Sequence, residues 1–223
     1  MTSLAAASET AVELKEVPLP GLAPVSFSLK PGEMGLFLTA KEEASALLAR
    51  LVLGLERHSG GSIVLLDADT AALSYRDWQQ LRQRIGFSQG SGGLVSNLKA
   101  WENLTLPLYY HRQASHQEVE SLGLALLERI GYTARYMELP GHLTLFQKKQ
   151  VGLARALIMD PELVVYESPE QGINQQEKEL FYRLIQEFHR ERPGRASLIV
   201  SCQPDSVAAF AEARLLAPKG QHA

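Results

Sequence analysis

Residues 143–157 read Leu-Thr-Leu-Phe-Gln-Lys-Lys-Gln-Val-Gly-Leu-Ala-Arg-Ala-Leu and predict a helix over residues 146–159. Pro161 follows this helix and marks a junction with the next element. The run Leu163-Val164-Val165-Tyr166 comes next, and it is short, continuous and apolar. Such a run is typical of a strand buried inside a parallel sheet. The stretch therefore predicts a helix that leads into the centre of a sheet.

Strands and helices alternate along the rest of the chain as well. The pattern predicts strands at Val12–Val17, Val25–Leu29, Met34–Leu38, 62–67, Ile85–Ser88, Leu163–Glu167, 198–202 and 214–217. It predicts further helices at 44–57, 75–84, 117–130, 175–192 and 204–211. The order predicts an α/β fold, and 223 residues suit one sizeable domain.

The net charge, the cysteine count and the lengths of the apolar runs exclude several classes of function. The formal net charge is −3 and no basic stripe is visible, so nucleic acid is not an expected partner. Cys202 is the single cysteine, which excludes an internal disulfide and fits a reducing compartment. The first sixteen residues do not resemble a signal peptide, and no apolar run reaches the ~18 residues of a membrane span. We expect a cytoplasmic protein that reaches a membrane only through a partner.

Residues 143–157 resemble the signature helix of ATP-binding-cassette (ABC) ATPases, LSGGQ followed by xQRVxLARAL. Thr144 and Gln147 fall on the S and Q of that pattern, and residues 151–157 match its tail. Leu145 and Phe146 replace the two glycines. In the family those glycines let backbone N–H groups at a helix start approach a γ-phosphate. The resemblance therefore implies that the helix is retained, and that the side chains of Leu145 and Phe146 block the approach of its N–H groups to a phosphate.

The resemblance covers about residues 12–217, with matches in register at 30–33, 51–56, 59–63, 73–86 and 101–108. It implies an ABC-type P-loop NTPase fold, with a mixed sheet core and a helical subdomain at about residues 91–160. The expected domain is 11–218, between a flexible start at 1–10 and a tail at 219–223. Residues 98–108 also look mildly like cassettes of lipid-trafficking transporters of the mammalian-cell-entry type.

The family's phosphate loop, G-x-x-x-x-G-K-[ST], surrounds phosphates with glycine N–H groups, a lysine and a hydroxyl. The aligned residues are Thr39-Ala40-Lys41-Glu42-Glu43-Ala44-Ser45-Ala46. Ser45 falls on the lysine, Ala46 on the hydroxyl residue, and Thr39 and Ala44 on the outer glycines. Glu42 and Glu43 place two negative charges where a polyphosphate would lie. Lys41 is either a displaced phosphate ligand or a solvated lysine.

The other catalytic positions of the family are altered too. Where the family ends a strand with Asp-Glu-Pro, this chain has Glu167-Ser168-Pro169, and a serine has no basicity to act as general base. Glu167 could reach a metal or could be a solvated strand-end carboxylate. Cys202 falls on the switch histidine. Gly90 falls on the Q-loop glutamine, although a one-residue slip would restore Gln89.

We interpret the chain as a degenerate, non-catalytic cassette of an ABC transport system, with no metal or cofactor expected. The expected partners are a membrane permease and a second cassette in a homo- or heterodimer, so the chain would lie at the inner face of the membrane. The candidate permease groove comprises Gly92, Leu94, Leu98, Trp101, Leu104, Leu106 and Tyr109, which could equally form the subdomain core.

Two alternatives remain open on the sequence alone. One is an active ATPase that uses Lys41 and Glu167 with ATP and Mg²⁺. The other is a soluble interaction protein derived from a cassette. Nucleotide binding separates the first alternative from our interpretation, and co-purification with a membrane protein separates the second.

Overall fold

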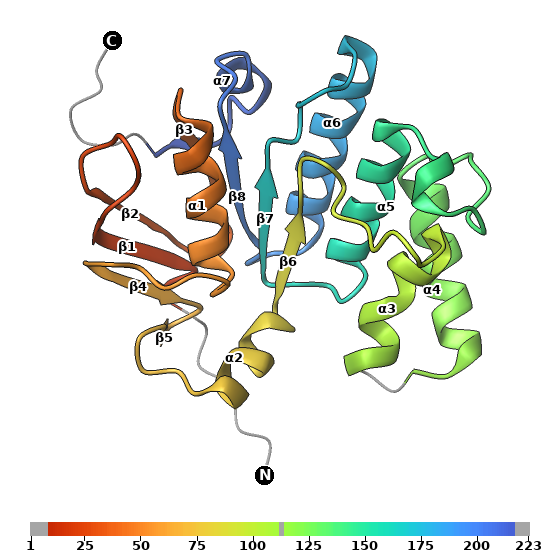
Figure 1. Ribbon diagram of the computed structural model, residues 1–223, viewed down its shortest axis with the longest axis horizontal. Coiled ribbons are helices and arrows are strands. Elements are labelled where there is room, and N and C mark those ends of the chain that lie inside the picture. Colours follow the sequence, from red (N-terminus) through yellow and green to blue (C-terminus); the bar gives the residue numbers. More distant parts are fainter. Residues whose placement is uncertain (1–8, 112–113, 217–223) are drawn as a thin grey trace.

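The computed structural model describes residues 9–111 and 114–216, which form two sheets with helices around them (Figure 1). The predicted tail at 219–223 lies outside the described residues, as does most of the predicted flexible start. Its last two residues, Glu9 and Thr10, are described, and their N–H groups donate to the carboxylate of Asp67.

The larger sheet is parallel and has the strand order β6-β7-β8-β3-β9. Its strands are β6 (Ile85–Ser88), β7 (Leu163–Glu167), β8 (Ala196–Ser201), β3 (Met34–Leu38) and β9 (Arg214–Leu215). The smaller sheet is antiparallel, in the order β2 (Val25–Leu29), β1 (Val12–Val17), β4 (Ser62–Leu65) and β5 (Ala68–Asp69). The prediction of an α/β fold with mixed sheets is confirmed.

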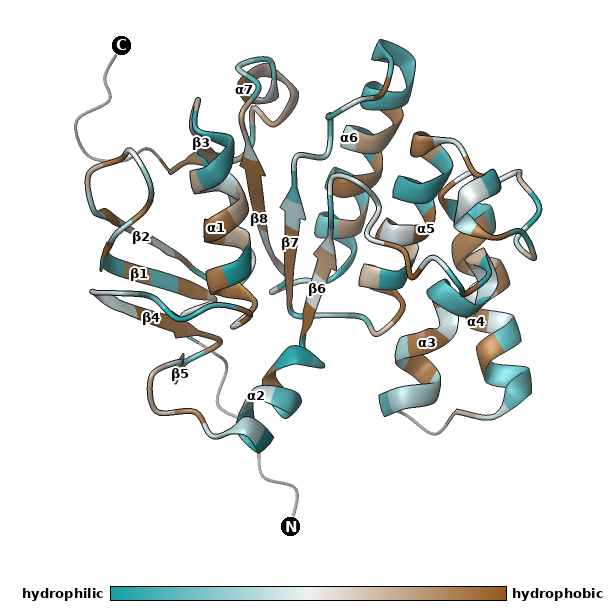
Figure 2. Cartoon of the chain, viewed as in Figure 1, coloured by the Kyte–Doolittle hydropathy of each residue, from teal (hydrophilic) through white to brown (hydrophobic). Residues whose placement is uncertain are grey.

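Helices cover the parallel sheet and form a separate helical part (Figure 1). Helix α1 (Glu42–Val52) packs on β7 and β8 and shares one apolar core with the antiparallel sheet. The remaining helices are α2 (Tyr75–Arg82), α3 (Ala100–His111), α4 (His116–Arg129), α5 (Leu145–Leu157), α6 (Gln175–Glu191) and α7 (Ser206–Ala209). A second core joins α3, α4, α5 and α6 to the sheet, whose strands are largely apolar (Figure 2).

Helix α1 lacks the N-terminal side-chain cap that several other helices have, and this difference matters for the site. Helices α2, α4, α5 and α6 each begin with a capping box, at Ser74, Ser115, Thr144 and Asn174. In such a box the N-cap side chain and the third helical residue satisfy each other's backbone N–H. Lys41 is the N-cap of α1, and within the described part of the chain no side chain caps that helix.

Several predicted elements have different bounds in the structure, and one helix was not predicted. The helix predicted at 44–57 runs from Glu42 to Val52, and Gly54 follows it with φ +63°. The strand predicted at 62–67 ends at Leu65, because Leu66 and Asp67 have positive φ and turn the chain into β5. The sequence analysis did not predict α3, which contains Pro107.

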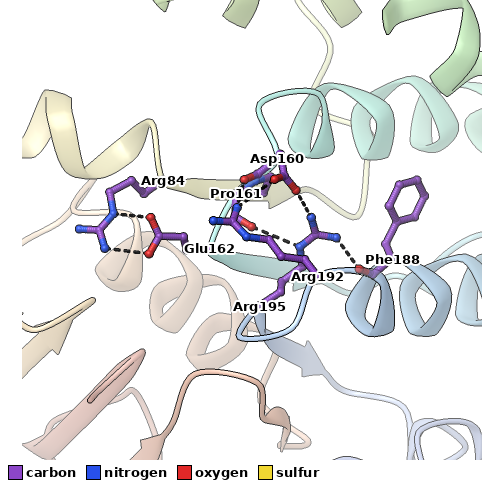
Figure 3. A network of polar contacts seen from close by, with 7 residues as sticks. All are labelled: Arg84, Asp160, Pro161, Glu162, Phe188, Arg192 and Arg195. Carbon is purple, nitrogen blue, oxygen red and sulfur yellow. Dashed lines mark hydrogen bonds and ion pairs between the residues drawn. The ribbon is translucent and has the colours of Figure 1, made fainter. Parts of the chain in front are cut away.

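A polar network lies where β7 and β8 begin (Figure 3). Arg84 donates to both carboxylate oxygens of Glu162, at 2.7 and 2.8 Å. The Arg195 side chain is only 4% exposed, and it donates to the Asp160 carboxylate and to the carbonyls of Pro161 and Phe188. This network ties the α5–β7 connection to the end of α6.

Candidate functional site

The candidate site lies at the edge of the parallel sheet where β3, β7 and β8 end. Carboxyl ends of parallel strands meet at one edge, and ligands of open α/β folds bind there. β3 ends at Leu38, β7 at Glu167 and β8 at Ser201, so residues far apart in sequence meet at this edge. The residues aligned with the family's phosphate loop, with its Asp-Glu-Pro strand end and with its switch histidine all lie at this edge.

The connection from β3 to α1 is short. α1 begins at Glu42, so three residues, 39–41, join the strand to the helix. The N–H of buried Thr39 donates to the Ser201 carbonyl at 3.1 Å, and the N–H of Lys41 donates to Thr39 Oγ1 at 3.2 Å. The N–H of Ser45 makes a helical bond to the Lys41 carbonyl. These three N–H groups are thus satisfied inside the protein.

The first turn of α1 carries two carboxylates. Glu42 and Glu43 are exposed there, close to the uncapped end of the helix. Negative side chains at a helix N-terminus interact favourably with the helix dipole. The same charges oppose the binding of an anion at that position.

The lysine position and the switch position meet inside the site. Ser45 is 2% exposed, and its Oγ lies 3.2 Å from the Sγ of Cys202. Burial raises the pKa of the Cys202 thiol, with the Ser45 contact opposing that shift. The thiol is therefore neutral at neutral pH, and this pair provides no charge for a phosphate. Ala44 is fully buried beside Ser45, and Ala46 is half-buried.

Glu167 is the carboxylate that remains at the end of β7. Burial raises its pKa, while a hydrogen bond from the Gly90 N–H and the charges of Arg50 and Lys149 oppose that rise. Ser168 follows with φ +43°, and its N–H donates to the Val200 carbonyl at 2.8 Å. Ser168 has no group that could accept a proton from an attacking water at neutral pH.

Lys41 lies at a shallow hollow of about 410 Å³ next to the site. The hollow is lined by Pro20, Gly21, Ala40, Lys41, Glu42 and Glu43. The Lys41 side chain runs alongside Gly21. Its charge thus sits beside two carboxylates, and a role as phosphate ligand remains a hypothesis.

The two candidate Q-loop residues, Gln89 and Gly90, differ in their exposure to solvent. Gly90 is buried, and its N–H interacts with the Glu167 carboxylate. Gln89 is exposed, and its carbonyl accepts from the Gly92 N–H at 2.8 Å. The structure therefore brings Gly90, rather than the Gln89 side chain, to the end of β7.

The replaced signature residues lie at the start of α5, where Phe146 is half-buried and Leu145 is 36% exposed. Thr144 Oγ1 accepts from the Gln147 N–H at 3.2 Å, and Gln147 Oε1 accepts from the Thr144 N–H at 2.9 Å. Leu145 lies against Gly172, and the ring of Phe146 packs edge-on to Phe181 at 6.5 Å between centroids. Side chains thus occupy the space that glycines would leave open.

The seven candidate groove residues do not form one surface. Leu104 is fully buried, and Trp101 packs on Gly123 of α4 and on the Tyr136 ring, 5.5 Å away between centroids. These two side chains belong to the packing of the helical part. Of the rest, Leu106 and Tyr109 are exposed, Leu94 and Leu98 are half-buried, and Gly92 is buried.

A small hollow of about 240 Å³ is lined by residues of α2, β6 and α3 and by residues at the end of α5. Its lining includes Phe87, Pro107, His111, Arg155 and Met159. The sequence analysis missed it because the lining comes from four separate segments, each of which looks like ordinary packing on its own. Burial lowers the pKa of His111, which therefore stays neutral at neutral pH.

Residues 9–111 and 114–216 contain neither a metal-binding cluster nor a membrane-spanning helix. Among them, no three His, Cys, Asp or Glu side chains gather closely enough to hold a metal ion. No helix in the same part of the chain combines the length and apolar character needed to cross a bilayer.

Comparison with known proteins identifies the family. A sequence model described as ABC transporter matches residues 22–171, more than half of the chain. The chain belongs to the ABC transporter family. The α/β fold with its two sheets matches that of solved ATP-binding cassettes.

Individual relatives agree with this assignment. The methionine import ATP-binding protein MetN of Caulobacter vibrioides is 31% identical over 77% of this chain and 52% of its own. A probable ribonucleotide transport ATP-binding protein of Mycobacterium leprae is 23% identical over 75% of this chain and 48% of its own. The chain thus spans about half the length of these curated relatives.

Solved structures share the fold. A dimeric bacterial ABC transporter cassette, MJ0796, superposes with a TM-score of 0.80 at 20% identity, covering 93% of this chain and 94% of its own. A structure of the same cassette in a post-hydrolysis state bound to ADP and Pi gives a TM-score of 0.78 at 22% identity, with coverage of 89% and 90%.

Proposed function

We propose that this chain is a non-catalytic cassette of an ABC transport system, which contributes a folded docking module rather than ATP hydrolysis. The observation that carries the proposal is the start of α1. There, Ser45 pairs with Cys202, the N–H groups of Thr39 and Lys41 bond internally, and Glu42 and Glu43 stand at the helix end. Phosphate transfer in P-loop enzymes depends on positioning and charge, and this edge supplies neither.

The proposed partner is a membrane permease, which would hold the chain at the cytoplasmic face of the membrane. The hollow between α2, β6, α3 and α5 supports this idea, because it joins the sheet to the helical part and is lined by Phe87 and Met159. A second cassette is the other proposed partner, since the similar cassette MJ0796 is dimeric. An intact partner cassette would supply the ATP chemistry of the pair.

An active ATPase is the second candidate. It is favoured by the names of the relatives, which are called ATP-binding proteins, and by the retained carboxylate Glu167. In that case Lys41 would serve as the phosphate ligand and Mg²⁺ would be held near Glu167.

Docking can be tested by co-expressing the chain with the proteins encoded beside it and recovering any membrane protein bound to it from detergent-solubilised membranes. Phe87→Glu alters the hollow, and Leu124→Glu alters an exposed leucine of α4 as a matched control. We expect Phe87→Glu to abolish recovery while Leu124→Glu retains it, provided both variants melt within a few degrees of the parent chain. Equal recovery of both folded variants would exclude the hollow, and failure to recover any membrane protein with the parent chain would favour a soluble interaction protein.

A further inference from the structure

A buried lysine joins α5 to the loop that follows β7. Lys149 lies on the second turn of α5 and is 1% exposed. Its Nζ donates to the carbonyls of Ser168 and Pro169, at 3.1 and 2.9 Å. Burial lowers the pKa of Lys149 to about 8, while Glu170 and Glu167 oppose that shift. An ammonium held away from water is costly unless it is paired, so these contacts must be well formed.

Two side chains at the start of α5 reinforce the same junction. Gly172 has φ +72°, and a Cβ at this residue would lie 2.6 Å from Leu145 Cδ2, so Leu145 fills the space above the loop. Phe146 packs on Phe181 of α6, and Lys149 Nζ lies 5.9 Å from the centre of that ring. Aromatic and cation–π contacts of this kind add to the hydrogen bonds.

The loop is held from its other side by Glu170. This side chain is 1% exposed, and its Oε1 accepts from Ser201 Oγ at 2.7 Å. Ser201 Oγ also lies 2.9 Å from Ser206 Oγ and accepts from the Gln203 N–H. Glu170 Oε2 has no hydrogen-bond partner among the described residues, and the charge of Lys149 attracts this carboxylate.

We propose that Lys149, Leu145 and Phe146 form an intramolecular clamp that fixes the helical part on the sheet without any ligand. The clamp runs from α5 through the loop at 168–172 to the end of β8, and Glu170 closes it on the far side. It places side chains of this chain at the helix start where a cassette would otherwise leave room for a ligand. The orientation of α3, α4 and α5 on the sheet is therefore the same with and without nucleotide.

Hydrogen exchange tests the clamp on the whole protein. Lys149→Met keeps the volume and removes the donors, Lys149→Gln keeps a shorter donor, and Lys148→Met is the matched control on the same helix. We expect exchange in segments 143–150 and 168–174 to rise at least tenfold in Lys149→Met, less in Lys149→Gln, and not in Lys148→Met. Exchange in β1 and β4 should stay unchanged in all three. No change in the two segments, or an equal rise along the whole chain, would overturn the proposal.

A distance measurement tests the fixed orientation directly. Spin labels at Leu124→Cys on α4 and Arg57→Cys after α1, in a Cys202→Ser background, report the separation of the two parts. We expect one narrow distance distribution, identical with and without 5 mM ATP, that broadens in Lys149→Met. A broad distribution in the parent, or one that shifts on adding ATP, would contradict the clamp. ATP binding detected by a melting shift, with the distance unchanged, would instead overturn the proposed loss of nucleotide binding and leave the clamp standing.

Discussion

The two edges of the parallel sheet differ sharply in their polar chemistry. Where β7 and β8 begin, Arg195 and Arg84 each make several charge-assisted contacts, and Arg195 does so while almost fully buried (Figure 3). Where the same strands end, Ser45 and Cys202 share a contact between neutral side chains, and the charged contacts there include those of Lys149 and Glu170 with a backbone carbonyl and a serine hydroxyl. The strand starts carry a charged network that joins neighbouring elements, whereas at the strand ends neutral Ser45 and Cys202 stand at the positions aligned with the family's lysine and switch histidine.

This difference separates two structural requirements, one for a packed fold and one for nucleotide chemistry. A packed cassette requires the strand starts, the α5–β7 connection and the apolar strands to stay in place. Nucleotide chemistry would require cations and free N–H groups at the strand ends. The strand starts meet the first requirement, and under the proposed function the strand ends need not meet the second.

The largest expected effect is at the beginning of the strands. Arg195→Met removes the donors to the buried carbonyls of Pro161 and Phe188, and it removes one of the two arginines that pair with the exposed Asp160 carboxylate. We expect the free energy of unfolding to fall by about 3–4 kcal/mol, measured by urea denaturation. Ser45→Ala at the other edge should change it by no more than about 0.5 kcal/mol. Similar losses in the free energy of unfolding for Arg195→Met and Ser45→Ala would contradict the difference between the two edges.

A pH dependence should follow from Lys149. Between its folded pKa of about 8 and its ordinary value of 10.5, the unfolded chain binds a proton that the folded chain does not. The free energy of unfolding should therefore rise from pH 8 to 10.5, by about 2–3 kcal/mol for this group. Tyrosines also titrate in this range, so the quantity to measure is the difference between the parent and Lys149→Met. A flat difference would show that Lys149 is charged and solvated.

A smaller effect should come from Glu162. Hydrogen bonds from Arg84 lower the pKa of this carboxyl, with burial opposing the shift. The contribution is present above the ordinary pKa of a glutamate and is lost as the pH falls through the lower folded value. Glu162→Gln should cost about 1 kcal/mol at pH 7, because the pair is partly exposed, and nothing at pH 2. Equal costs at both pH values would assign the effect to packing instead.

The smallest expected effect is on catalysis by partial repair. Ala44→Gly with Ser45→Lys supplies a lysine and a glycine, but the connection from β3 keeps three residues and Ser168 remains in place of a base. Ser168→Glu alone supplies the base without a phosphate site. Catalytic groups that act as a unit are strongly non-additive, so phosphate release should stay at the level of a mock purification in both. Turnover by either repair would mean that the site is more complete than its geometry indicates.

Much of the fold could be predicted from the sequence because it rests on local patterns. The runs at 163–166 and 198–200 are unbroken apolar strands, and α5 follows a strong helical pattern. Helix α3 was missed because Pro107 interrupts its pattern. The early start of α1 was missed because the predicted helix began at Ala44, whereas the preceding Glu42 and Glu43 are themselves good helix formers.

The candidate site was predictable only in part, because spacing shows which residues align and not what they touch. The approach of Ser45 to Cys202 follows from the alignment of two family positions. The burial of Trp101 against α4 and the contacts of Lys149 depend on packing between segments that no local pattern connects. Lys149 carried a weak signal, a lysine inside the buried face of a helix, which the sequence analysis did not follow.

The central claim is that the edge where β3, β7 and β8 end does not bind nucleotide, and isothermal titration of the purified chain with ATP and Mg²⁺ tests it most directly. A bound ligand stabilises a fold by about 2.7 kcal/mol at a hundredfold excess over its Kd, so a melting curve at millimolar ATP is a sensitive second reading. We predict no heat of binding and no melting shift, while an intact cassette measured alongside shows both. A saturable heat with a matching rise in melting temperature, lost in Lys41→Ala or Glu167→Gln, would contradict the account.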